Sequence, residues 1–159
     1  MREVRGDMML QDIYVLAKER SVQYAHRFID AWAKGFEEVA IEYEFPQYSD
    51  EPKSVYLNPK DLIEQLVQDP KEPHAIYWHN PQNSIVSSAM LFFTIDGGMI
   101  AGLSVKTENV QELENYLQDL AGAVEGELGA VFYEEPPPDS VKEFKRRVIL
   151  STVPKLLPY

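Results

Sequence analysis

Apolar residues recur at helical spacing in four segments of the chain. The longer stripes lie in residues 22–36, 59–69 and 110–124, and a shorter one lies in residues 141–148. A residue that can cap the first turn of a helix precedes each stripe: Ser21, Asn58, Asn109 and Ser140. Gly35 stands where the first helix should end. The pattern therefore predicts three or four helices.

Shorter runs of apolar, aromatic and β-branched residues predict strands in residues 12–19, 39–45, 54–57, 74–79, 88–95, 99–105 and 129–134. The first of these runs is also compatible with a helix. Asp96-Gly97-Gly98 separates two of them and is a strong hairpin signal, because glycine permits the positive φ of tight turns. Gly102 inside the returning strand predicts a bulge or a closely packed helix.

Residues 39–45 show the clearest alternation. Val39, Ile41, Tyr43 and Phe45 should face one side of a strand, and Glu42 and Glu44 the other. Two such carboxylates would lie about 7 Å apart on one face and repel each other. A cation from a partner would relieve that repulsion.

The order of the elements predicts an α+β protein of one domain over residues 1–159. We expect a mainly antiparallel sheet of about five or six strands with three or four helices. Residues 142–159 form a basic, apolar C-terminal extension that proline interrupts, and it should wrap the body or contact a neighbouring chain, possible homodimers included.

The net charge of the chain limits the kinds of partner that it can bind. The chain has 26 acidic and 15 basic residues, a net charge of −11, and residues 1–141 alone carry −15. Such a body repels nucleic acid and anionic membranes and attracts basic proteins. An alternative is that the acidic excess only keeps the protein in solution. Cysteine is absent, and the first residues lack the apolar core of a signal peptide, so we expect a cytoplasmic protein.

Two acidic stretches contain aromatic residues, in residues 37–51 and 125–139, and neither contains a lysine or arginine. A disordered acidic tail is poor in aromatic residues, so these stretches should be folded. The partner-binding residues predicted from them are Glu42, Glu44, Tyr48, Asp50, Glu51, Glu134 and Glu135. The alternative is that the acids only protect a sheet edge from aggregation.

Motifs for catalysis or cofactor binding are not found. The histidine spacing gives no metal site, and the sequence has no nucleophile elbow, phosphate loop or dinucleotide fingerprint, so no cofactor is expected. Asp96 with Glu134 and Glu135 remains as a carboxylate pair for acid–base chemistry in a cleft under Trp78. Hairpin tips commonly carry Asp for structural reasons, which weakens that alternative.

Four stretches together resemble the small acidic immunity proteins of bacterial toxin–immunity systems: YEFPQYSDEP (43–52), AIYWHN (75–80), AMLFFTIDGGMIAGLSV (89–105) and YEEPPPDS (133–140). The resemblance spans about residues 12–140. It implies a cytoplasmic inhibitor without enzymatic activity, encoded beside a toxin that it binds and neutralises. A small carboxylate-dependent enzyme and a regulatory or assembly subunit remain the alternatives.

Overall fold

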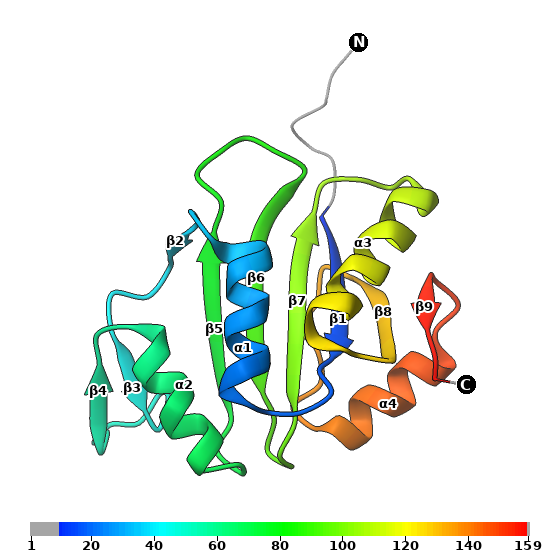
Figure 1. The fold of residues 1–159 in the computed structure, drawn as a ribbon. Helices are drawn as coiled ribbons and strands as arrows, with labels where there is room; N and C mark the ends of the chain where they lie inside the picture. The colour runs from blue at the N-terminus through cyan, green and yellow to red at the C-terminus, as the bar shows by residue number, and fades with distance from the viewer. Residues whose placement is uncertain (1–9, 159) are drawn as a thin grey trace.

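The computed structural model describes residues 10–158, which form a seven-stranded sheet, a separate two-stranded hairpin and four α-helices (Figure 1). The sheet order is β2-β5-β6-β7-β1-β8-β9, and all neighbouring strands are antiparallel. Its strands are β1 (Gln11–Leu16), β2 (Glu37–Glu38), β5 (His74–His79), β6 (Val86–Phe93), β7 (Met99–Val105), β8 (Leu128–Tyr133) and β9 (Lys155–Leu156). The hairpin joins β3 (Tyr43–Phe45) to β4 (Ser54–Tyr56). The predicted α+β class with a mainly antiparallel sheet is confirmed.

The helices begin where their capping residues predict. They are α1 (Val22–Phe28), which continues as the π-helical turn η2 (Ile29–Ala33), α2 (Pro59–Gln68), α3 (Val110–Val124) and α4 (Val141–Leu150). The side chains of Ser21, Asn58, Asn109 and Ser140 each accept a hydrogen bond from a backbone N–H in the first turn. Gly35 follows the first helix with φ of 85°, a conformation that favours glycine.

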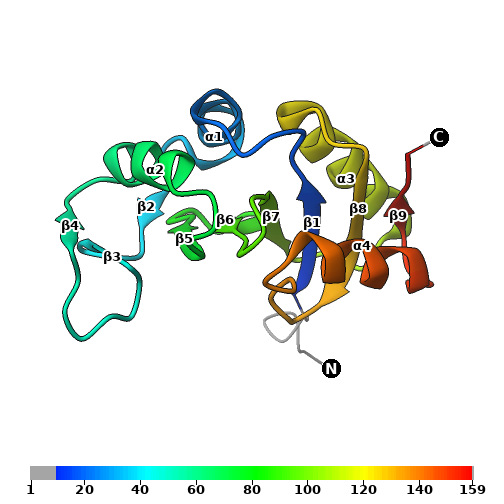
Figure 2. The same ribbon diagram turned by 90° about the horizontal axis from the view of Figure 1, so that it is seen from below.

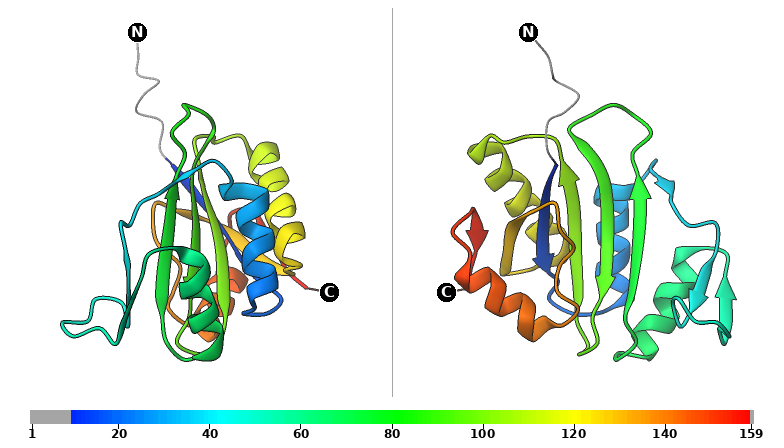
Figure 3. Two further views of the ribbon diagram at one scale, coloured as in Figure 1. Left: turned by 60° about the vertical axis from the view of Figure 1, so that its left-hand side comes forward. Right: turned by 180° about the vertical axis from the view of Figure 1, so that it is seen from behind.

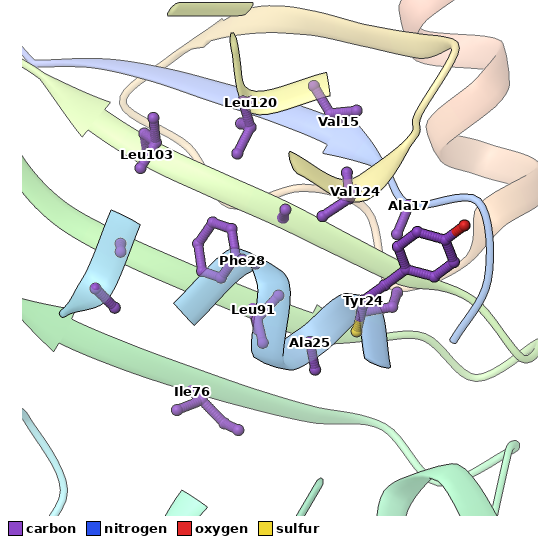
Figure 4. Packing of buried hydrophobic residues seen from close by; sticks show 14 of the residues in the cluster. Val15, Ala17, Tyr24, Ala25, Phe28, Ile76, Leu91, Leu103, Leu120 and Val124 are labelled. Carbon is purple, nitrogen blue, oxygen red and sulfur yellow. The ribbon is translucent and has the colours of Figure 1, made fainter. Parts of the chain in front are cut away.

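One face of the sheet carries the main core. Phe28 of α1 and Leu120 and Val124 of α3 pack over Leu91 and Leu103 of the central strands, and all five are fully buried (Figure 4). Helix α2 joins the same layer beside α1 and contacts the β3–β4 hairpin (Figure 2). The three helices thus cover this face from β5 to β8.

The other face is covered over only part of its width. Phe144 and Val148 of α4 pack with Tyr14 of β1, Ile100 of β7 and Phe132 of β8 in a second, smaller cluster. Gly102 of β7 lies in this region, where an added Cβ would come within 2.7 Å of the Tyr14 ring. Glycine is therefore required at this position by the close approach of the Tyr14 ring. The sequence had suggested a bulge or a closely packed helix as the reason.

The alternation in residues 39–45 predicts one strand, and this prediction is wrong. Val39 and Ile41 are 62% and 94% exposed, whereas Tyr43 and Phe45 are buried. The chain bends between β2 and β3, so only the last three residues of the segment form a strand. Glu42 precedes that strand and does not share a strand face with Glu44.

The C-terminal segment joins the sheet through β9. Lys155 and Leu156 pair with Ala130 and Gly129 of β8, and the Val131 N–H donates to the Pro154 carbonyl. This segment therefore packs on the body of its own chain. A homodimer through the tail stays a prediction.

Arg20, between β1 and α1, connects three separate segments. Its guanidinium donates hydrogen bonds to the carbonyl oxygens of Leu66, Asp69, Glu72, Thr94 and Gly98, at 2.8 to 3.4 Å. It also lies 5.1 Å from the centre of the Phe93 ring. Burial lowers the pKa of Arg20 to about 10, so the group stays charged at neutral pH.

Replacing Arg20 by methionine should lower the free energy of unfolding by about 3 kcal/mol or more, because several partly buried carbonyls lose their donor. Urea denaturation measures this loss. The control is Arg146→Met, since Arg146 is exposed and, within residues 10–158, pairs with Glu143 of the same helix; its cost should be much smaller than that of Arg20→Met. Equal losses in the two variants would contradict the role assigned to Arg20.

Candidate protein-binding face

The sheet face opposite α1 and α3 is open over β5 and β6, beside the part that α4 covers (Figure 2). We call this region the open face. Its floor contains a row of aromatic rings that crosses the strands. The Tyr77 and Phe92 ring centres lie 5.7 Å apart, Phe92 and Tyr14 also 5.7 Å, and Tyr14 and Phe132 5.3 Å, all close to edge-to-face. Such contacts favour a rigid floor, with Tyr77 still 38% exposed.

Two loops form walls on either side of the open face. The hairpin wall comprises residues 39–53, and the proline wall comprises residues 134–140. Both project from the side of the sheet that faces away from α1 and α3 (Figures 2 and 3). The floor and walls together form a trough.

Three neighbouring hollows lie in this trough, with volumes of about 440, 450 and 230 Å³. The first two share Tyr77, and the first and third share Tyr48. The smallest is lined from both walls, by Tyr48 on one side and by Pro137 and Pro138 on the other. The walls therefore approach each other at that end.

The hairpin wall is attached to the edge of β5 by a side chain that imitates a strand. The Gln47 amide group donates to the Ala75 carbonyl at 3.2 Å and accepts from the Ala75 N–H at 2.9 Å. His74 Nε2 lies 3.0 Å from the Glu44 carbonyl oxygen, and burial lowers the pKa of His74. Because the edge groups of Ala75 are paired, they are not available to another strand.

The proline wall is attached to the sheet and to α4. The Tyr14 hydroxyl donates to the Glu135 carbonyl at 2.8 Å, and Arg147 binds the Glu135 carboxylate at 2.6 Å. At the far end of the wall, the Asp96 carboxylate accepts the Val141 and Lys142 N–H groups at 2.8 and 3.3 Å. Glu134 has φ of 50°, in the left-handed region.

Five of the seven predicted site residues line the trough. Glu42, Glu44 and Tyr48 line the hollow beside the hairpin wall, and Glu134 and Glu135 line the hollow beside the proline wall. Tyr48 is 82% exposed and Glu134 is exposed, whereas Glu135 is occupied by Arg147. The structure thus places the two acidic stretches on opposite sides of one face.

The other two predicted residues, Asp50 and Glu51, are exposed in the loop between β3 and β4. They line none of the three hollows. Their participation in binding stays a prediction.

Asp12 is a residue of the trough that sequence reasoning missed. It is only 8% exposed, and the Ser104 hydroxyl donates to its carboxylate at 2.5 Å. Burial raises the pKa of Asp12, although hydrogen bonds from Ser104 and the Glu135 backbone partly oppose this shift. The available sequence signal was a carboxylate directly before the apolar run of residues 13–16 in the same strand.

The carboxylate pair considered for catalysis is not assembled as expected. Asp96 caps α4, so its oxygens already accept backbone hydrogen bonds. Trp78 is buried on the helix-covered face near Phe28 and has no cleft beneath it that contains Asp96. Among residues 10–158, no group of three histidine or acidic side chains is arranged to hold a metal ion.

Comparisons with known proteins concern the fold. No family model matches the chain, and no curated protein matches it. A solved structure that does match is a chain of the crystal structure of the toxic C-terminal tip of CdiA from Pseudomonas aeruginosa in complex with immune protein. The TM-score is 0.51 at 11% identity, over 79% of this chain and 86% of that chain. At this identity, the likeness shows a shared fold.

The helices within residues 10–158 were also compared with the requirements of a membrane span. None combines the length and the apolar character that crossing a bilayer requires.

Asp96→Ala should cost about 1 kcal/mol of stability at neutral pH, because α4 loses a cap. Burial alone would raise the pKa of Asp96, but hydrogen bonds from Val141, Thr94 and Lys142 outweigh it and lower the pKa. The stabilisation should therefore be present above the ordinary carboxyl pKa of 3.8 and be lost as the pH falls below it. Thermal unfolding across this range, with exposed Asp50→Ala as the control, measures the effect. A cost that is independent of pH would contradict it.

Proposed function

We propose that this chain is an immunity-type inhibitor that binds a cognate bacterial toxin domain and neutralises it through acidic surfaces. The observation that carries the proposal is that two acidic stretches, far apart in sequence, border one open face with an aromatic floor. The fold shared with a chain of a toxin–immune protein complex supports the same context. The partner-binding residues proposed are Glu42, Glu44, Tyr48, Asp50, Glu51, Glu134 and Glu135.

The negative net charge of the chain favours the role of the inhibitor over that of the toxin. The net charge of −11 makes this chain repel nucleic acid and attract proteins with basic surfaces. Many proteins that act on nucleic acid have such basic surfaces. An acidic face also increases the rate at which a basic partner is captured. Rapid capture is what protection against a toxin requires. In this proposal the inhibitor covers the toxin's active site or holds the toxin in an inactive form, and it contributes no catalysis.

The partner can be identified from the neighbouring gene or by co-purification from the native host. The toxin domain obtained in this way provides the binding partner for kinetic measurements. Co-expression of that domain with the chain should restore growth of the producing cells. If the chain neither binds nor protects against it, the proposed function is wrong.

The double variant Glu42→Gln/Glu44→Gln should slow association with this toxin domain roughly tenfold at low salt and weaken the salt dependence of the rate. The substitutions keep the shape of the side chains and remove only their charge. Stopped-flow mixing at several ionic strengths measures both quantities.

The matched control is Glu108→Gln/Glu114→Gln, which removes the same charge from exposed positions at and just before α3, on the opposite side of the molecule. Its association rate should change less than threefold, an estimate for distant, screened charges. Equal effects of the two pairs would mean that only net charge matters and that the assigned residues are wrong.

A further inference from the structure

The floor of the trough is aromatic and partly exposed, although its walls are acidic. Tyr77 and Phe92 form its centre. Tyr48 of the hairpin wall is 82% exposed and lines one hollow with Tyr77 and another with Phe92. Tyr48 and Tyr77 are close enough for the presence of Tyr48 to affect the pKa of Tyr77, which burial chiefly raises. Clustered exposed aromatic side chains are typical of the centres of protein interfaces.

Charge is segregated around this floor. The carboxylates that line the three hollows are Asp12, Glu42, Glu44, Glu72, Glu134, Glu135 and Asp139. Within the part of the chain that the structure describes, no lysine or arginine lines them. Hollows elsewhere on the molecule do contain Lys18, Lys145 or Arg147. The negative charge is therefore a local property of the trough as well as a consequence of overall composition.

The covered end of the same aromatic row already binds a guanidinium. Arg147 lies 5.2 Å from the centre of the Phe132 ring and pairs with the Glu135 carboxylate at 2.6 Å. Phe132 contacts Tyr14, which contacts Phe92 and thereby continues to the open end. At the covered end of the row, an aromatic ring and a neighbouring carboxylate together bind an arginine. The open end also combines an aromatic ring, Tyr77, with carboxylates, and no lysine or arginine is among the described residues that line its hollow.

The anchor points of the walls limit the size of the occupant. The hairpin wall is attached at Ala75 of β5, and the proline wall at Tyr14 of β1. These two strands are three positions apart in the sheet, which corresponds to roughly 14 Å at the usual strand spacing. An α-helix with its side chains is about 10–12 Å across, so its width matches this separation.

We propose that the open face is a docking surface for a basic helix of the partner protein, whose arginine side chains lie over Tyr77 and Phe92. Charge complementarity selects the occupant, since each wall offers carboxylates, with Glu42 and Glu44 on one side and Glu134 on the other. Arginine suits the floor better than lysine, because its planar guanidinium stacks on aromatic rings and binds carboxylates at the same time. The inference rests on the proposed function only for the identity of the partner.

The walls and the floor have different kinetic roles in this proposal. Exposed wall charges act at a distance and determine how fast the helix arrives. Contacts with the rings form only after docking and determine how long it stays. Tyr77→Ala should therefore increase the dissociation rate of the toxin domain about tenfold and leave its association rate within about twofold.

The direct test uses an alanine-based helical peptide with arginine at every fourth position, which places the arginines on one side of the helix. Its lysine counterpart is the comparison peptide. Nuclear magnetic resonance titration of the whole chain should show shifts concentrated at Tyr48, Tyr77, Phe92 and Glu134, with the arginine peptide binding at least about threefold more tightly. Tyr77→Ala should weaken that binding about fivefold. The control Leu57→Ala, at a 78% exposed apolar position that lines none of the three hollows, should not.

Shifts spread over all acidic regions, or equal binding of both peptides that does not depend on Tyr77, would overturn the docking surface. Circular dichroism and thermal unfolding of Tyr77→Ala verify that the variant is folded. The toxin domain separates this inference from the proposed function. If the domain binds and Tyr77→Ala leaves its dissociation unchanged, the docking surface is wrong and the function stands. If the peptide maps to the trough but the domain does not bind, the function is wrong and the docking surface stands.

Discussion

The five hydrogen bonds from Arg20 to backbone carbonyls hold both walls of the trough in place. Three of the acceptors lie at the end of α2 and in the loop after it, and α2 contacts the β3–β4 hairpin. The other two, Thr94 and Gly98, bracket the β6–β7 turn. The Ile95 N–H of that turn donates to the Asp139 carbonyl of the proline wall, and Asp96 binds the first residues of α4, which follow the wall. One half-buried cation therefore links the supports of two surface loops.

The uneven covering of the sheet produces the open face. Three helices fill one side, whereas α4 on the other side reaches only the strands near β8. The uncovered rings of Tyr77 and Phe92 would favour self-association if the surrounding surface were neutral. Acidic walls oppose this, because two copies of the same negative face repel each other. In the proposed complex the same charges would attract a basic partner, so one set of carboxylates would both disfavour self-association and favour a cationic surface.

The sequence predicts the elements whose signals are local. Each helix start followed from one capping side chain, and the β6–β7 hairpin followed from Asp96-Gly97-Gly98. The prediction of one strand over residues 39–45 was wrong. Alternation of apolar and polar residues indicates which side chains could share a face, but it does not indicate whether the backbone stays extended. The role of Arg20 could not be predicted, because its acceptors are backbone carbonyls, which every residue has. The exposure of Tyr77 was also beyond prediction, since it depends on which strands α4 covers.

The two acidic stretches border the same face only because of the sheet topology. Insertion of β1 between β7 and β8 brings the end of β8, and the proline wall that follows it, beside strands formed some 30 to 60 residues earlier. Tyr14 and Asp12 of β1 then hold that wall over the rim of the floor. Long-range pairing of this kind is slow to form and must be complete before the trough exists. A partner that recognises both walls therefore recognises the folded chain alone, and binding to it stabilises the native state by mass action.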